Sequence, residues 1–119
     1  MSPLIFALAA VAGGLGAGLR YLVDTGITRL LGRRFPWGIV VVNVSGSFAL
    51  GLVTAALPEQ LFVVGAGLLG GYTTFSTAML DSILLWRAGE RRTAVLHSLG
   101  MLVLGLFAAG AGLALGTAF

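Results

Sequence analysis

Apolar residues fill four long stretches of the chain, and short polar segments separate them. The stretches cover about residues 4–23, 37–57, 61–86 and 94–117 of the 119-residue sequence. A helix needs about 20 mostly apolar residues to cross about 30 Å of hydrocarbon, and each stretch reaches that length. The pattern therefore predicts an all-α membrane protein with four transmembrane helices, forming a single domain over residues 1–119.

The breaks between the stretches carry residues that end helices or sit at membrane interfaces. Residues 33–36 (RRFP) precede the second stretch, residues 58–60 (PEQ) separate the second from the third, and residues 87–92 separate the third from the fourth. Trp37 and Trp86 lie beside two of these breaks, where indole rings favour the boundary between lipid and water.

Composition supports lipid as the main solvent. The chain is 58% hydrophobic and only 9% charged, whereas soluble domains average about 25% charged residues. It has no cysteine, which excludes disulfides and thiolate metal sites. The first apolar stretch begins without a positive segment, which argues against a cleaved signal peptide.

All seven basic side chains are arginines, and they lie at or in two of the breaks. With four spans, the break after span one and the break after span three face the same side of the membrane. The positive-inside rule predicts that this side is cytoplasmic and that both termini are extracytoplasmic. The arginines therefore set topology, and a nucleic-acid interface is not needed to explain the positive charge. They are Arg20, Arg29, Arg33, Arg34, Arg87, Arg91 and Arg92.

Nineteen glycines are too many for ordinary soluble helices, where each costs about 1 kcal/mol relative to alanine. In membranes small residues let helix backbones approach closely. Three pairs have the four-residue spacing of such contacts: Gly14 with Gly18, Gly67 with Gly71, and Gly112 with Gly116. We expect the last pair to serve packing alone.

The most informative polar cluster is residues 70–77 (GGYTTFST), in the middle of span three. Two glycines followed closely by two threonines make a poor helix centre, and the span is longer than a simple crossing requires. One interpretation is a helix broken at its midpoint, with backbone groups freed to face protein, water or an ion. The other is a tight crossing point whose hydroxyls bond back to the preceding turn.

Other polar side chains within or near the spans have two interpretations each. Asn43 offers an amide donor at depth, either for function or for bonding another helix. Arg20 either extends to the interface or forms an anion-attracting vestibule. Asp81 and His97 lie near span ends, and we expect His97 at the interface.

Over its whole length the chain resembles the Fluc/CrcB family of fluoride-specific ion channels. The resemblance rests on the length, the four spans and three segments. The segments are residues 13–17 leading to Arg20 and Tyr21, residues 42–48 (VNVSGSF), and residues 70–77 (GGYTTFST), of which the last is highly specific.

The resemblance implies an antiparallel dimer in the cell membrane with two narrow pores along its interface, through which cytoplasmic F⁻ leaves passively. A structural Na⁺ is implied at the break in span three, bound by the backbone carbonyls of Gly70 and Thr73. Arg20 matches the vestibule arginine of the family. The residues implied to line the fluoride pore are Asn43, Phe75, Thr74, Ser76 and Thr77.

These residue types suit the chemistry of fluoride. A pore must replace the water around a small, tightly hydrated anion with hydrogen-bond donors, which amides and hydroxyls supply. The edge of a phenyl ring is electron-poor and can face an anion. Backbone carbonyls are hard oxygen ligands that suit a monovalent cation, whose charge adds to the local field.

The sequence departs from the family pattern at two places. Ala78 stands where the family has a second pore phenylalanine, and residues 99–116 lack the hydroxyls usual in span four. Together with the one-sided arginines, these departures favour an antiparallel heterodimer with a paralogue. The alternative is a homodimer in which a few inverted copies suffice.

Two other functions remain as alternatives, and a third class is rejected. A small multidrug exporter needs a carboxylate within span one, but the first acid is Asp24. A non-conducting assembly subunit is the second alternative. An intramembrane enzyme would need a nucleophile beside a base at depth, and no carboxylate accompanies the serines.

Overall fold

The computed structural model describes residues 2–119, and all the regular structure in this range is helical. Four helical segments are long and apolar enough to cross a membrane, as the sequence predicts; the third runs from Pro58 to Arg87 in several pieces. In chain order the elements are α1 (Pro3–Leu31), α2 (Trp37–Ala56), η1 (Pro58–Gln60), η2 (Leu61–Leu69), α3 (Gly70–Tyr72), α4 (Phe75–Arg87) and α5 (Arg91–Gly116).

Two helices extend further than the apolar stretches that predict them. Helix α1 continues past residue 23 to Leu31, because the first helix-ending residue is Gly32, a C-cap with φ 83°. Helix α5 begins at Arg91, directly after a turn at Gly89 with φ 88°. Several arginines expected in loops therefore belong to helix ends, and the connections between helices are short.

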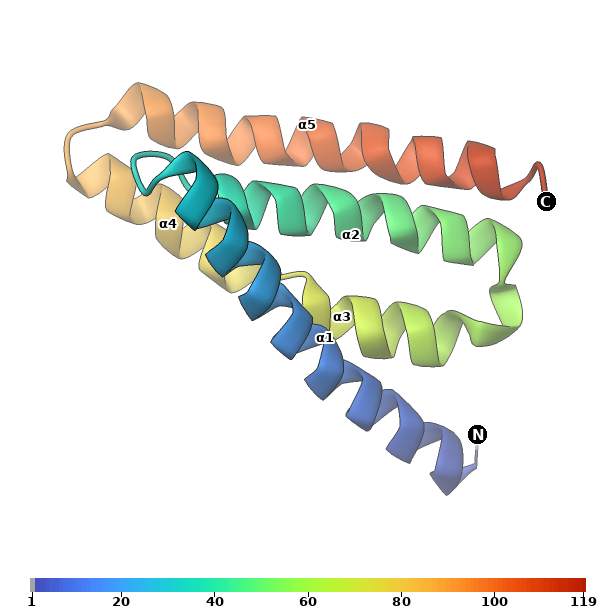
Figure 1. Cartoon of the computed structure of the whole chain (residues 1–119). Helices are drawn as coiled ribbons and strands as arrows, with labels where there is room; N and C mark the ends of the chain where they lie inside the picture. The colour runs from blue at the N-terminus through green and yellow to red at the C-terminus, as the bar shows by residue number, and fades with distance from the viewer. Residues whose placement is uncertain (1) are drawn as a thin grey trace.

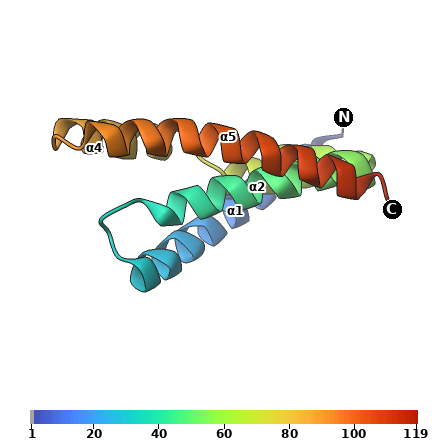
Figure 2. The same cartoon turned by 90° about the horizontal axis from the view of Figure 1, so that it is seen from above.

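The helices form a bundle in which α2 lies between α1 and α5 (Figure 2). Helices α2 and α5 run side by side and make the most extensive contact in the molecule (Figure 1). Helix α1 crosses η2 and α3 obliquely, and α4 packs against the first half of α5. This arrangement brings the interrupted third span next to both α1 and α2.

Glycines bring the helix backbones together at two of these contacts. A Cβ atom on Gly112 would collide with the backbone of α2, and one on Gly71 would collide with the carbonyl oxygen of Gly13 in α1. The packing role expected for Gly112 and Gly116 is therefore confirmed. The pair Gly14 and Gly18 faces open space within the chain.

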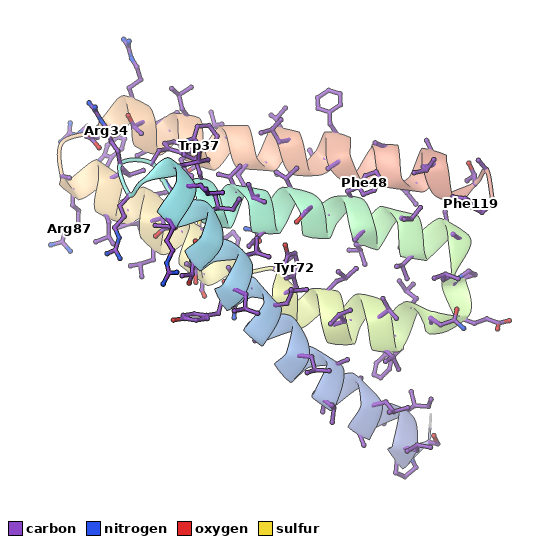
Figure 3. The ribbon with its side chains drawn as sticks, viewed as in Figure 1. Arg34, Trp37, Phe48, Tyr72, Arg87 and Phe119 are labelled. Atoms are coloured by element: carbon purple, nitrogen blue, oxygen red, sulfur yellow. The ribbon has the colours of Figure 1, made fainter. Side chains whose placement is uncertain are left out.

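The two arginine-bearing connections lie at one end of the molecule, as the sequence predicts. Figure 3 shows Arg34 and Arg87 at this end, with Phe119 at the opposite end. We call it the arginine end. The guanidinium of Arg91 lies 4.9 Å from the centre of the Trp86 ring, a cation–π contact that orders this end.

His97, which we expect near the membrane interface, is buried among other segments of the chain. Only 1% of its surface is exposed. Its Nδ1 lies 2.7 Å from Ser82 Oγ, and its ring meets Phe35 edge-on at a centroid distance of 5.4 Å. The side chain thus joins α4, α5 and the α1–α2 connection, a contact between distant segments that hydropathy along the chain does not reveal.

Candidate ion-permeation site at the broken third helix

The third span is interrupted at Thr73 and Thr74, which confirms the predicted midpoint break. Both residues adopt extended backbone angles, φ −78° and ψ 159° for Thr73, and φ −148° and ψ 124° for Thr74. The preceding η2 is a π-helix, a wide form that is frequent at functional sites. The Thr73 hydroxyl also donates to the Leu69 carbonyl at 2.9 Å, so the bond back to the preceding turn coexists with the break.

Asn43 of α2 holds the break through two hydrogen bonds to one residue. Its Nδ2 donates to the Thr74 carbonyl at 2.8 Å, and its Oδ1 accepts from the Thr74 amide at 2.9 Å. Thr74 is only 9% exposed, and unpaired polar backbone at such depth is costly. The Asn43 side chain therefore replaces the helical acceptor that the Thr74 amide has lost and adds a donor to the Thr74 carbonyl.

The same bonds free two backbone carbonyls. In a continuous helix the Thr74 amide would donate to Gly70 and the Thr77 amide to Thr73. Here the Thr74 amide donates to Asn43, and the Thr77 amide donates to Thr74 Oγ1 at 3.2 Å. The carbonyls of Gly70 and Thr73 thereby lose their regular helical donors.

These are the two carbonyls that the family resemblance implies as ligands of a structural Na⁺. Hard oxygen atoms without helical donors are the chemistry that a monovalent cation requires, so the residues present fit such an ion. When bound, the cation would supply positive charge at the break, and Gly70 and Thr73 would hold it.

A groove of about 1070 Å³ opens beside the break, between the third span and the α2–α5 pair. Most of its lining is apolar. Five of the residues predicted for the pore or the cation site lie along it, namely Asn43, Gly70, Thr73, Thr74 and Phe75. The structure thus brings together the larger part of the predicted site.

Two polar groups in the groove retain donor capacity for an anion. The Thr74 hydroxyl accepts from the Thr77 amide, which leaves its own proton available. The second proton of the Asn43 amide faces only the sulfur of Met101, at 3.4 Å. A thioether is a weak acceptor, so a small anion competes easily for this proton. The Ser47 hydroxyl has no proton left for an anion, because it donates to the backbone carbonyl of Asn43 at 2.7 Å.

Phe75 and Ala78 differ sharply in their surroundings. Phe75 begins α4 and is 78% exposed, so its ring is free to meet a partner outside the chain. Ala78 is 1% exposed and packs in a core with Ile39, Val40 and Met101. The position of the family's second phenylalanine is therefore occupied by a small residue at a helix contact.

The remaining predicted residues lie away from the groove. Thr77 lines a second hollow of about 700 Å³ toward the arginine end, together with Asp81 and Arg33. Ser76 is exposed, and Arg20 is half-buried on α1. Thr74 lines the groove and Thr77 lines the second hollow, and the hydrogen bond from the Thr77 amide to Thr74 Oγ1 links the two residues.

Sequence reasoning missed three residues at this site. Met101 contacts the Asn43 amide from α5, and Ser45 Oγ lies 2.9 Å from the hydroxyl of Tyr72 beside the break. Ser45 and Tyr72 belong to the two polar segments singled out in the sequence, but their pairing spans 27 residues. Hydropathy alone does not indicate which polar residues of two spans meet.

Four helices long and apolar enough to cross a membrane indicate a multi-pass membrane protein, and the break in the third span borders a groove with free hydrogen-bond donors. Comparison with known proteins agrees. The model of the family described as CrcB-like protein, Camphor Resistance (CrcB), matches residues 7–113, and the chain belongs to this family.

Several relatives have names that state an activity. The chain is 46% identical over 115 residues to "Fluoride-specific ion channel FluC 1" of Rubrobacter xylanophilus, covering 94% of this chain and 93% of that protein. It is 44% identical over 122 residues to a protein of the same name from Leifsonia xyli, covering 98% and 89%. It is also 44% identical over 118 residues to "Fluoride-specific ion channel FluC 2" of Nitrobacter hamburgensis, covering 92% and 94%.

Proposed function

We propose that the chain is a subunit of a fluoride-specific channel that lets cytoplasmic F⁻ leave the cell passively. The observation that carries the proposal is the pairing of Asn43 with the broken third span, which holds two donors in an apolar groove. The names of its relatives give the identity of the ion.

The pore chemistry follows from what the groove retains. F⁻ loses water on entry and receives the second Asn43 N–H and the Thr74 hydroxyl in exchange. The exposed Phe75 ring presents an electron-poor edge to the same ion. Because the surrounding lining is apolar, these few donors act in a low dielectric, where each is stronger than in water.

Two further parts of the site assist the anion. A Na⁺ held by the Gly70 and Thr73 carbonyls places a fixed positive charge beside the path. Ser76 and Thr77 add two hydroxyls in the first turn of α4 beyond the groove, and Thr77 lines the second hollow. Arg20 on α1 raises the local concentration of anions at the entrance.

Direction and orientation follow from charge. The arginine end faces the cytoplasm and both termini are extracytoplasmic, in accordance with the positive-inside rule. HF is a weak acid that crosses membranes in its neutral form and ionises inside the cell. A passive path for the trapped F⁻ therefore relieves fluoride toxicity without an energy source.

The conducting unit is an antiparallel dimer with a paralogue. The exposed Phe75 ring and the open groove are surfaces that a second subunit covers. The partner supplies the second ring absent at Ala78 and the hydroxyls absent from residues 99–116. The numbers 1 and 2 in the relatives' names are consistent with paralogues.

A growth assay tests this proposal in cells. A bacterial strain lacking fluoride exporters is grown in fluoride with the chain alone, with the chain and its paralogue, or with the Asn43→Leu chain and the paralogue. Protection is expected from the wild-type pair and not from the Asn43→Leu pair. If the wild-type pair inserts into the membrane without protecting, the chain is a non-conducting assembly subunit.

A further inference from the structure

One turn of α2 contacts three consecutive residues of the break. Ser45 Oγ lies 2.9 Å from the Tyr72 hydroxyl, and Asn43 makes its two hydrogen bonds with Thr74. Thr73 lies between Tyr72 and Thr74, and its methyl group faces Gly46. A Cβ atom at position 46 would collide with that methyl group. We call these three contacts the α2 clamp.

The direction of the Ser45–Tyr72 hydrogen bond follows from the other bond that Ser45 makes. Its hydroxyl donates to the Val42 carbonyl at 3.2 Å, so its single proton is committed. Tyr72 therefore donates to Ser45 Oγ. Tyr72 is only 7% exposed, and a buried phenol hydroxyl needs a partner. Ser45 is that partner.

The clamp fixes the peptide groups on both sides of Thr73. The Thr73 carbonyl and the Thr74 amide share one planar trans peptide, in which C=O and N–H point in opposite directions. Because the Thr74 amide donates to Asn43, the Thr73 carbonyl points away from α2's asparagine. On the other side, the Thr73 amide and hydroxyl both donate to the Leu69 carbonyl at 2.9 Å.

We propose that Ser45 and Tyr72 are positioning residues that set the cation affinity of the break. Their hydrogen bond anchors the residue before Thr73, while Asn43 anchors the residue after it, so the freed Gly70 and Thr73 carbonyls keep one arrangement. Without the Tyr72 anchor, the last turn before the break rotates more freely and the carbonyl pair loses its fixed geometry. This inference rests on the proposed Na⁺ site.

The experiment measures sodium binding apart from fluoride flux. The Tm of the purified, fluoride-conducting assembly is titrated with NaCl against an equal concentration of N-methylglucamine chloride, which gives the Na⁺ concentration for half of the stabilisation. The variants are Tyr72→Phe, Ser45→Ala, the double variant, and Ser45→Thr, which keeps the hydroxyl. Tyr21→Phe is the matched control, because Tyr21 is 70% exposed.

One neutral hydrogen bond changes an equilibrium constant by about three- to tenfold. We expect Tyr72→Phe and Ser45→Ala each to raise the half-stabilising Na⁺ concentration by about that factor. The double variant should be no worse than either single variant, and both Ser45→Thr and Tyr21→Phe should match the wild type. Hydrogen exchange of residues 70–77 in saturating Na⁺ should be faster in Tyr72→Phe.

Two contrary results are distinguishable. If every variant lowers Tm equally with and without Na⁺ and leaves the half-stabilising concentration unchanged, Ser45 and Tyr72 are merely structural and the inference is overturned. If the wild-type Tm itself does not respond to Na⁺, the proposed cation site is wrong, whatever the variants do. Should Tyr72→Phe fail to assemble, Ser45→Ala alone decides, because its smaller change keeps the phenol ring.

Discussion

At the level of single residues, Asn43 has two tasks that one substitution removes together. Its amide pairs with both backbone groups of Thr74, and its remaining proton faces the groove. Phe75, next to Thr74 in the chain, contributes little to packing within the chain because most of its surface is exposed. A substitution at Phe75 therefore tests permeation alone, whereas one at Asn43 affects stability and permeation together.

Asn43→Leu should lower both the stability and the fluoride flux of the channel. The change leaves the buried Thr74 amide without an acceptor, and such an unpaired group costs about 1–3 kcal/mol. A Tm measurement and fluoride-electrode efflux on the same preparation check this. Thr54→Val on the exposed side of α2 is the control, and it should change stability by less than about 0.5 kcal/mol. A wild-type Tm in Asn43→Leu would show that Thr74 has other partners.

Phe75→Ile should lower fluoride flux by about tenfold, since an aromatic contact contributes about 0.5–1.5 kcal/mol. The Tm of the chain should stay nearly unchanged, because Phe75 is exposed. The matched control is Phe107→Ile, because Phe107 is 74% exposed on α5, outside the groove lining. Flux in both variants is compared with the wild type in liposomes. Equal flux in all three proteins would remove Phe75 from the pore.

At the level of elements, the third span depends on two adjacent glycines with different surroundings. A Cβ atom on Gly71 would collide with the backbone of Gly13 in α1. A Cβ atom on Gly70 would lie 3.8 Å from the Gly65 carbonyl oxygen, an ordinary contact. Only Gly71 is required by packing within the chain, whereas Gly70 borders the groove.

Gly71→Ala should therefore destabilise the chain by about 1–3 kcal/mol through overpacking against α1. Gly70→Ala should leave the fold of the chain intact, but it should reduce the Na⁺-dependent stabilisation of the assembly. Thermal unfolding with and without Na⁺ distinguishes the two variants. Equal losses in Na⁺-free buffer would contradict the separate roles assigned to these glycines.

The sequence predicts the elements better than their contacts. Four spans follow from apolar stretches, and the break follows from the glycine–threonine pattern at residues 70–77, because each signal is local. Helix α1 extends further, since polar residues continue it until Gly32 ends it, and α5 begins earlier, at Arg91, shortly after the turn at Gly89. The Asn43–Thr74 pair joins residues 31 apart, and His97 is buried between distant segments, so neither arrangement follows from local pattern.

At the level of the whole molecule, the proposed assembly and its orientation rest on the distribution of charge and on the exposed surface. Arg34 and Arg87 lie at one end of the molecule, and Phe119 lies at the opposite end (Figure 3). A groove of about 1070 Å³ and an exposed Phe75 remain for a second subunit to cover. An antiparallel homodimer would require half of the copies to insert against the arginine bias.

Topology mapping tests the heterodimer. With C-terminal reporters that are active on only one side of the membrane, nearly every copy should show an extracytoplasmic C-terminus. Replacing Arg33, Arg34, Arg91 and Arg92 by glutamine should increase the inverted fraction, because it weakens the bias. Equal populations of both orientations in the wild type, with robust flux from the chain alone, would establish a homodimer instead.

The most direct measurement is ion efflux from liposomes that contain the chain together with its paralogue. Vesicles are loaded with equal concentrations of F⁻ and Cl⁻, and ion-selective electrodes follow the release of each. A fluoride-specific pore built on Asn43, Thr74 and Phe75 predicts rapid F⁻ release, with Cl⁻ release no faster than from empty liposomes. Equal rates for the two anions, or no F⁻ release from a folded and inserted assembly, would contradict the assignment as a fluoride channel.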